Sequence, residues 1–250
     1  MATLAGKTIV VVGGSSGIGY GVAKAALLSR AEQVIIGSSS QTKVNGALAR
    51  LQAELTAIGG AAVEGKLTGE IVNARDSASV KGLFKRIGVI DHLVWTSGDP
   101  LRLGFPDIDL NLNKDVFDVR FWGAAIAAQS AQFRRGGSVT LSVGSALVKP
   151  RKSWSMMAGV LGAVDSLTRG LAVDLAPVRV NVVCPGIVKT ELWDPVAPEV
   201  KNKMFEDAAR TLLVQHVADA DEVAEAYLFL MKCGYITGQR IEVDGGNKFV

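Results

Sequence analysis

Short apolar runs alternate with longer stretches of mixed polarity along this chain. The runs are rich in valine, isoleucine and leucine, and they do not alternate residue by residue with polar positions as half-exposed strands do. They lie at 9–12, 33–37, 70–73, 92–95, 138–142, 178–183 and 240–243. Continuous apolar strands of this length are typical of a parallel sheet that is covered on both faces. The pattern therefore predicts a sheet of about seven strands.

The stretches between these runs have the composition of helices. They predict helices at about 22–28, 43–56, 77–86, 114–133, 155–175 and 219–231, with Ser77 and Asp219 as N-caps and with the second helix ending before Gly59 and Gly60. Because strands and helices alternate, we expect a single α/β domain over residues 1–250, a doubly wound parallel sheet with helices on both faces. Residues 195–203 are the only stretch that resembles a mobile insertion.

The first apolar run leads directly into a glycine-rich turn. Residues 13–19 read Gly-Gly-Ser-Ser-Gly-Ile-Gly and precede a helix-forming stretch. The first N–H groups of a helix lack intrahelical partners and lie at the positive end of the helix dipole, so such a turn favours an anion such as a pyrophosphate. Glycine allows that anion to approach the backbone closely. The alternative is that these glycines serve only the packing of helix against strand.

Charge and composition limit the kinds of ligand and partner that we expect for this chain. A net charge of +3 without a block of Lys and Arg favours neither nucleic acid nor a membrane surface. The two cysteines, Cys184 and Cys233, and the two histidines, His92 and His216, lack metal-ligand spacing, so we expect no metal site and no disulfide framework. No signal pattern and no uninterrupted run of 18 apolar residues is found, which predicts a cytoplasmic protein with a small-molecule substrate and no membrane segment.

The spacing of the glycine-rich turn, G-x-x-x-G-x-G, resembles that of the short-chain dehydrogenase/reductase family. Further matches follow in order, so that the resemblance covers nearly the whole chain. Residues 95–98 (Trp-Thr-Ser-Gly) follow the fourth strand, where the family has Asn-Asn-Ala-Gly. Residues 184–190 (Cys-Pro-Gly-Ile-Val-Lys-Thr) match its P-G-x-x-x-T motif, and 167–181 and 236–246 match its last helix-to-strand passage and its C-terminal signature. The resemblance implies a Rossmann fold.

The resemblance also implies which residues bind a dinucleotide. In the family, backbone groups after the sixth strand bind the nicotinamide carboxamide, and the threonine of the motif reaches a phosphate. The cofactor-binding residues implied here are Gly13, Ser15, Ser16, Gly17, Ile18, Gly19, Ser38, Ser39, Ser40, Lys43, Asn73, Thr96, Ser97, Gly98, Pro185, Gly186, Ile187, Val188 and Thr190. A substrate lid near 190–212 and a homodimer or homotetramer formed through the two long helices are implied as well.

The end of the second strand indicates NADP(H) rather than NAD. An NAD site usually places a carboxylate there to accept hydrogen bonds from the ribose 2′-hydroxyl. This chain has Ser38, Ser39 and Ser40 at that place, with Lys43 one turn further on, and hydroxyls beside a cation suit a 2′-phosphate. The alternative is that the three serines only cap the following helix. Asn73 stands where the family often has an aspartate that contacts the adenine.

The residues at the catalytic positions of the family are all changed. The family exchanges a proton through a tyrosine whose pKa is lowered by a lysine four residues later, and a serine and an asparagine complete its site. The resemblance places Met157 at the tyrosine, Leu161 at the lysine, Gly144 at the serine and Arg120 at the asparagine. Thioether and isobutyl groups neither donate nor accept a proton, so ketone reduction through the usual relay is disfavoured.

Arg120 is the candidate catalytic residue, with an orienting or electrostatic role. An unpaired guanidinium is costly to bury, so we expect it to face a ligand or, alternatively, to pair with Asp99, Asp118 or Asp165. For Asp165 itself a surface or interface role is expected. The candidate substrate pocket consists of Trp95, Ser142, Gly144, Ser145, Trp154, Met157, Leu161 and Trp193.

Three functions follow as hypotheses. The first is an NADPH-dependent reductase of a preformed electrophile such as an iminium ion, because hydride transfer to such a group needs no protein acid. This pattern is similar to the degenerate reductases of fungal prenylated indole-alkaloid pathways, which reduce an iminium and guide an intramolecular Diels–Alder cyclisation. The second is a carbonyl reductase with Arg120 or water as proton source. The third is an inactive NADP-binding sensor or scaffold whose pocket is filled beside the nicotinamide.

Overall fold

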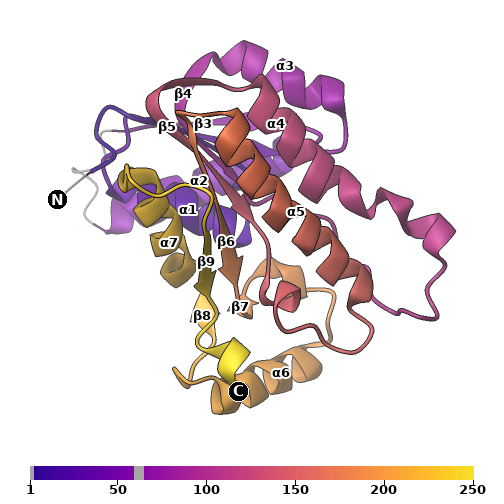
Figure 1. Ribbon diagram of the computed structural model, residues 1–250. Helices are drawn as coiled ribbons and strands as arrows, with labels where there is room; N and C mark the ends of the chain where they lie inside the picture. Colours follow the sequence, from indigo (N-terminus) through magenta and orange to yellow (C-terminus); the bar gives the residue numbers. More distant parts are fainter. Residues whose placement is uncertain (1–2, 59–64) are drawn as a thin grey trace.

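The computed structural model describes residues 3–58 and 65–250, and over these ranges the chain forms one parallel sheet of seven strands with helices on both faces (Figure 1). The strands are β1 (Thr8–Val12), β2 (Gln33–Ser38), β3 (Lys66–Ile71), β4 (Val89–Trp95), β5 (Gln132–Ser142), β6 (Arg179–Pro185) and β9 (Arg240–Val243). Their order across the sheet is β3-β2-β1-β4-β5-β6-β9, and every neighbouring pair is parallel. The predicted fold is confirmed.

Seven α-helices in the described part of the chain form the outer layers. They are α1 (Gly17–Leu28), α2 (Gln41–Ala57), α3 (Ser77–Ile87), α4 (Ala124–Ser130), α5 (Ser155–Asp174), α6 (Pro198–Thr211) and α7 (Ala220–Lys232). Helices α1, α2 and α7 pack into one hydrophobic cluster, and α3, α4 and α5 pack into another on the opposite face. Helix α6 lies apart from both layers, below the sheet in the view of Figure 1, where it is followed by the short strand β8 (Ala218–Asp219), which pairs with β7 (Val188–Lys189).

The central strand β1 shows why these runs are apolar throughout. All five of its residues are buried. Ile9 and Val11 point into the cluster under α1, whereas Val10 and Val12 point into the cluster under α3 and α4. Since successive side chains of a strand point to opposite faces, a sheet covered on both sides needs apolar residues at every position.

The strand order reverses direction at β1. The chain runs from β1 outward to β2 and β3, and then returns to place β4 on the other side of β1. The loops that follow β1 and β4 therefore diverge, and they open a crevice at the carboxyl ends of the strands, where α/β sheets bind their ligands.

Several predicted boundaries were wrong. The third strand lies at Lys66–Ile71 rather than 70–73, because an edge strand is only partly covered and needs fewer apolar residues. The helical region predicted at 114–133 begins with a 3₁₀ segment at Leu110–Phe117, continues as one π turn at Asp118–Gly123, and ends with α4, since the following residues already belong to β5.

Helix caps account for further differences. Asp76, not Ser77, caps α3, because its carboxylate accepts a hydrogen bond from the N–H of Ala78. Asp219 caps α7 as predicted, in a capping box with Glu222. The stretch predicted as a mobile insertion at 195–203 leads into α6, which has a proline at its start. Gly59 and Gly60 lie outside the described residues.

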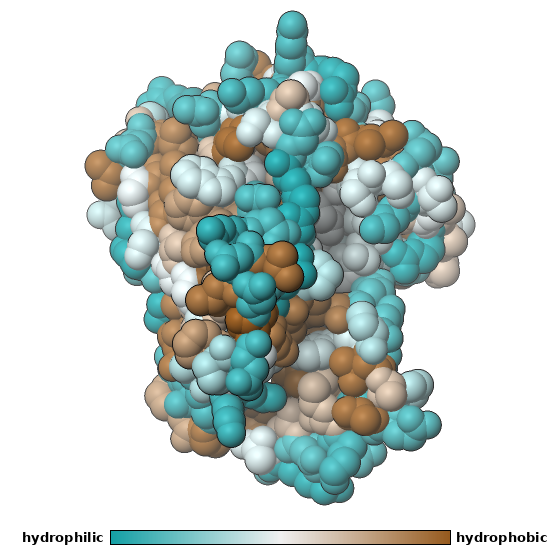
Figure 2. Space-filling model, turned by 90° about the vertical axis from the view of Figure 1, so that its right-hand side faces the viewer, coloured by the Kyte–Doolittle hydropathy of each residue, from teal (hydrophilic) through white to brown (hydrophobic). Residues whose placement is uncertain are grey.

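Helix α5 is long and apolar, and it remains partly uncovered. By length and composition alone it is the one helix among residues 3–58 and 65–250 that could cross a membrane, yet it packs on the sheet as one layer of the fold. Val173 on α5 is 77% exposed, and Trp122, just before α4, is 57% exposed. Figure 2 shows apolar side chains gathered in the middle of this side of the molecule, above the polar surface at its lower end.

Candidate cofactor and substrate site

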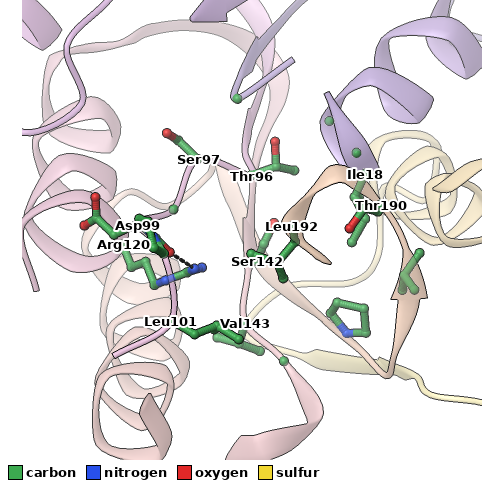
Figure 3. A pocket seen from close by; sticks show the side chains of 18 of the residues that line it. Ile18, Thr96, Ser97, Asp99, Leu101, Arg120, Ser142, Val143, Thr190 and Leu192 are labelled. Carbon is green, nitrogen blue, oxygen red and sulfur yellow. Dashed lines mark hydrogen bonds between the residues drawn. The ribbon is translucent and has the colours of Figure 1, made fainter. Parts of the chain in front are cut away.

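A cavity of about 860 Å³ lies at the carboxyl ends of the strands (Figure 3). Its walls come from the segments that follow β1, β2, β4, β5 and β6, and from residues 190–212. Of the residues predicted as cofactor site, substrate pocket or catalytic residue, all line this cavity except Ser40 and Trp95. In Figure 3, Arg120 and Asp99 lie on one side, Ile18 and Thr190 lie on the other, and Ser142 lies between them.

The glycine-rich turn forms a cradle that side chains would fill. Gly13 has a φ of +91°, and a Cβ there would lie 2.6 Å from the backbone nitrogen of Ser97. A Cβ on Gly19 would collide with the carbonyl of Gly13 and the hydroxyl of Thr96. The N-cap Ser16 makes no side-chain capping bond to α1. A helix N-terminus between close backbone walls fits a pyrophosphate.

Glu191 reaches the same helix N-terminus, and the sequence analysis missed it. Its carboxylate accepts a hydrogen bond from the N–H of Gly17 at 2.8 Å, and it lies 3.6 Å from the guanidinium of Arg50. Arg50 in turn donates to the carbonyl of Ser15. A carboxylate at this place occupies a position that suits a phosphate. Its position directly after Thr190 was the only available signal.

The end of β2 presents hydroxyls and a cation to the cavity. The hydroxyls of Ser15 and Ser38 are 2.8 Å apart, and the ammonium of Lys43 donates to the hydroxyl of Ser39 at 3.4 Å. Ser40 does not line the cavity, unlike the other residues predicted for the cofactor site. Its hydroxyl accepts from the backbone N–H of Lys43 and caps α2, so the capping alternative holds for this serine alone.

Arg120 is a half-buried cation without a carboxylate partner among the described residues. Its Nη2 donates to the backbone carbonyl of Asp99 at 2.7 Å, the one hydrogen bond that its side chain makes to those residues (Figure 3). Burial lowers the pKa of Arg120, and the nearby charge of Asp99 opposes this shift only in part. The remaining N–H groups of the guanidinium are therefore available to a ligand in the cavity.

The three carboxylates predicted as partners of Arg120 pair with other arginines. Asp99 faces Arg75, whose Nη2 lies 2.7 Å from its Oδ1, and Asp118 lies 3.5 Å from Arg75. Burial raises the pKa of Asp99, against the effect of Arg75. Asp165 pairs with Arg169 and Arg240. Because it is only 6% exposed, its expected surface role was wrong.

Apolar side chains stand where the family relay was expected. Met157 and Leu161 line the cavity and are otherwise buried, at 1% and 5% exposure. Met157 packs with Val116 and Val160, and Trp154 packs against the same cluster. This wall holds no group that titrates near neutral pH.

The aromatic residues divide between cavity and core. Trp154 and Trp193 line the cavity, and the indole N–H of Trp193 donates to the carbonyl of Val188. Trp95 was predicted in the pocket, and this was wrong. It is 2% exposed and packs in the core, where its indole N–H donates to the carbonyl of Val119.

A buried tyrosine on the last helix contacts this site. The hydroxyl of Tyr227, on α7, lies 2.7 Å from that of Ser142, which also donates to the carbonyl of Trp95 at 2.8 Å. Burial raises the pKa of Tyr227, which is fully buried. The two hydroxyls are 85 residues apart in the sequence, and no local pattern signals their contact.

The segment 190–212 closes one side of the cavity. Leu192, Trp193 and Leu212 add apolar surface to it, and Thr190 and Ile18 lie on the same side of it (Figure 3). No group of three His, Cys, Asp or Glu side chains placed to hold a metal ion is present within residues 3–58 and 65–250. The site thus combines a glycine-rich cradle that fits a phosphate, the guanidinium of Arg120 without a carboxylate partner among the described residues, and mainly apolar walls.

Comparison with known proteins agrees with this geometry. The family described as SDR-like Rossmann domain matches residues 1–250. The short-chain dehydrogenase/reductase fsr5 of Gibberella fujikuroi is 35% identical, over 98% of this chain and 96% of that protein. The structure of the MalC reductase/Diels-Alderase from Malbranchea aurantiaca has a TM-score of 0.90 at 28% identity, over 99% and 98% of the two chains. A small-chain dehydrogenase in complex with NADPH has a TM-score of 0.78 at 29% identity, over 98% and 99%. The chain belongs to the short-chain dehydrogenase/reductase family of oxidoreductases.

Proposed function

We propose that the protein is an NADPH-dependent reductase of a preformed electrophile such as an iminium ion. The observation that carries the proposal is Arg120, a half-buried cation without a carboxylate partner among the described residues, which lines the same cavity as the apolar Met157 and Leu161. A site with a strong donor, and with the apolar Met157 and Leu161 in place of the usual proton relay, suits a substrate that already carries an electrophilic carbon and that presents an oxygen to the guanidinium.

NADP(H) is the cofactor that the cradle fits. The glycines leave room for a pyrophosphate, and Ser38, Ser39 and Lys43 place hydroxyls and a cation where an NAD site would place a carboxylate. The related dehydrogenase that was solved with NADPH supports the same choice. When bound, NADPH supplies the hydride.

The residues of this chain then bind and orient the substrate. Arg120 holds a carbonyl or carboxylate oxygen, and its own position is held by the carbonyl of Asp99. Trp154, Met157 and Leu161 exclude water and shape the substrate, and Trp193 belongs to the lid proposed at 190–212. No proton has to leave the protein, because an iminium carbon accepts a hydride directly.

A second activity, intramolecular cycloaddition, is supported by the likeness to the MalC reductase/Diels-Alderase. Apolar walls bring diene and dienophile together, and hydrogen bonds from Arg120 to a carbonyl make the dienophile more electron-poor. A carbonyl reductase that uses Arg120 or water as proton source is the nearest alternative. The scaffold hypothesis requires a filled pocket, and a cavity of about 860 Å³ counts against it.

Deuterium transfer tests the proposal. Single-turnover reactions with NADPH deuterated at C4 and an iminium substrate are expected to place deuterium on the product carbon with one stereochemistry. Arg120→Lys keeps the charge but loses the planar donor pair, and it should raise the KM for a substrate with an adjacent carbonyl by about tenfold. Tight NADPH binding without any deuterium transfer would overturn the proposal. Undiminished reduction of simple ketones by Arg120→Ala would exclude Arg120 as a proton source.

A homodimer or homotetramer formed through α4 and α5 is part of the proposal. The exposed Trp122 and Val173 lie on this surface, and an exposed apolar surface of this kind is typical of an interface. Light scattering is expected to give the mass of a dimer or tetramer, and Val173→Glu is expected to lower it. Val200→Glu, at an exposed position on α6, is the matched control.

A further inference from the structure

Ser142 lies at the end of β5 and lines the cavity between the cofactor cradle and Arg120 (Figure 3). Its hydroxyl has two protein partners. It lies 2.8 Å from the carbonyl oxygen of Trp95 and 2.7 Å from the hydroxyl of Tyr227. These two contacts decide what the hydroxyl can still offer to a ligand.

The direction of both hydrogen bonds follows from the chemistry of the partners. A carbonyl oxygen only accepts, so the single hydrogen of Ser142 is donated to Trp95. The hydrogen between the two hydroxyls must therefore come from Tyr227, which has no other side-chain partner within residues 3–58 and 65–250. One lone pair of Ser142 remains for a ligand, because the residue lines the cavity.

Tyr227 is suited to hold this arrangement. Its side chain is 0% exposed and packs among residues of α1 and α7. Burial raises its pKa, so it keeps its proton and its role as a donor across the physiological range. Reversal of the two hydrogen bonds would leave the buried hydroxyl hydrogen of Tyr227 without an acceptor, which is costly.

We propose that Tyr227 and the carbonyl of Trp95 fix Ser142 as a hydrogen-bond acceptor, so that the cavity selects a ligand N–H or O–H group at this point and rejects a carbonyl oxygen. The inference rests on the proposed function only in taking this cavity as the place where cofactor and substrate bind. The donor comes either from the carboxamide of the nicotinamide or from the substrate.

The chemical consequence is a preference that an ordinary serine does not impose. A free hydroxyl rotates and serves a carbonyl or an N–H equally well. Here a carbonyl oxygen would meet a lone pair, and the hydrogen of Ser142 could turn to it only if the bond to Trp95 broke. A reductase with this serine disfavours a ketone oxygen at Ser142 and favours a nitrogen-bearing group.

Equilibrium binding with matched probe pairs tests this assignment. The first pair is NADP⁺ and its 3-acetylpyridine analogue, which keeps the carbonyl of the carboxamide but replaces the NH₂ by a methyl group. The second pair is indole and 1-methylindole, titrated into the complex with NADP⁺. The proteins compared are the wild type, Ser142→Ala, Ser142→Cys and Tyr227→Phe. Ser166→Ala, which removes an exposed hydroxyl on α5 outside the cavity, is the control.

In the wild type we expect the N–H member of at least one pair to bind about tenfold more tightly than the methylated member. Ser142→Ala should remove most of that ratio. Ser142→Cys should do the same, because it keeps the volume but is a weak acceptor, so extra room is not the cause. Tyr227→Phe should reduce the ratio less than the Ser142 variants do, because the hydroxyl of Ser142 is kept but becomes free to turn. Ser166→Ala should leave the ratio unchanged.

The pair that responds identifies the source of the donor. A change confined to the cofactor pair assigns it to the carboxamide, and a change confined to the indole pair assigns it to the substrate. The proposal is overturned if neither pair is discriminated by the wild type, if the Ser142 variants keep the ratio, or if Ser166→Ala lowers it equally. No turnover is measured, so a failure of deuterium transfer would overturn the proposed function and leave these ratios standing.

Discussion

The guanidinium of Arg120 lies against the Cα of Gly98, in the space that a side chain at position 98 would need. A Cβ built there would lie 2.6 Å from Nη2 and closer still to Nη1 and Cζ. The φ of Gly98 is not positive, so its backbone would accept an alanine. Glycine is required here by the arginine side chain, which it allows to reach the carbonyl of the next residue, Asp99.

Gly98→Ala is therefore expected to displace the guanidinium and to raise the KM of a carbonyl-bearing substrate by about tenfold or more, through loss of its hydrogen bonds. In an Arg120→Ala background the same change should have no further effect on the KM, because the space is already empty. Steady-state kinetics of the wild type, Gly98→Ala, Arg120→Ala and the double variant checks this double-mutant cycle. The Kd of NADPH is measured separately for each protein. Equal effects of Gly98→Ala in both backgrounds would show that the contact does not matter.

Glu191→Gln is expected to tighten NADPH binding. The carboxylate of Glu191 accepts a hydrogen bond from the N–H of Gly17, close to the proposed place of the pyrophosphate. Replacement by the amide of glutamine removes the negative charge of this side chain. The side chain is 45% exposed and screened by solvent, so the gain should be modest, about two- to fivefold, and smaller at high salt. Fluorescence titration at two ionic strengths measures it. Glu199→Gln, an exposed change on α6, serves as control, and weaker binding by Glu191→Gln would contradict the expectation.

Ser38→Asp is expected to lower the preference for NADPH over NADH by about tenfold or more. A carboxylate beside Ser15 would repel a 2′-phosphate and accept hydrogen bonds from a 2′-hydroxyl. The ratio of the two Kd values is the measurement. Ser40→Asp should leave that ratio unchanged, because Ser40 caps α2 outside the cavity and aspartate is an equally good N-cap. A shift in Ser40→Asp of the same size would place the phosphate elsewhere.

Stability is expected to fall in mild acid because of His92. Burial lowers the pKa of this side chain from 6.5 to about 4, and its Nδ1 lies 2.8 Å from the hydroxyl of Ser138. Between these two values the unfolded chain binds a proton that the folded protein does not. The free energy of unfolding therefore decreases as the pH falls from 6.5 toward 4, by about 3 kcal/mol at most.

Urea unfolding between pH 7.5 and 5 checks this slope, which His92→Asn should flatten. The other histidine, His216, acts in the opposite direction. Its hydrogen bond to Glu222 raises its pKa, so its contribution is present at low pH and is lost as the pH rises. His216→Gln is therefore the background for both measurements. An unchanged slope in His92→Asn would mean that another group titrates in this range.

Patterns of neighbouring residues predicted the elements that depend on those residues alone. The apolar runs identified each central strand because burial on both faces demands apolar residues at successive positions, as in β1. The partly covered edge strand β3 lacks this constraint, and its position was wrong. The family motifs predicted residues between Gly13 and Trp193 that line one cavity in the structure.

Contacts between distant segments could not be predicted in the same way. Trp95 and Ser142 end neighbouring strands and both carry side chains suited to a pocket, yet one side chain points into the core and the other lines the cavity. The choice depends on side-chain direction and on what packs from elsewhere, here Val119 and Tyr227. The same is true of Arg120, whose partner proved to be a backbone carbonyl rather than a carboxylate.

The unpaired charge of Arg120 also has a practical meaning for the choice of buffer. With no carboxylate to neutralise it within residues 3–58 and 65–250, the guanidinium attracts whatever anion the solution provides. Sulfate, phosphate or citrate at millimolar concentrations should compete with the oxygen of a weakly bound substrate. Assays in buffers of large organic anions with little chloride would then report a higher affinity for the substrate than assays in sulfate or phosphate. Crystals grown from ammonium sulfate would trap an inhibited form.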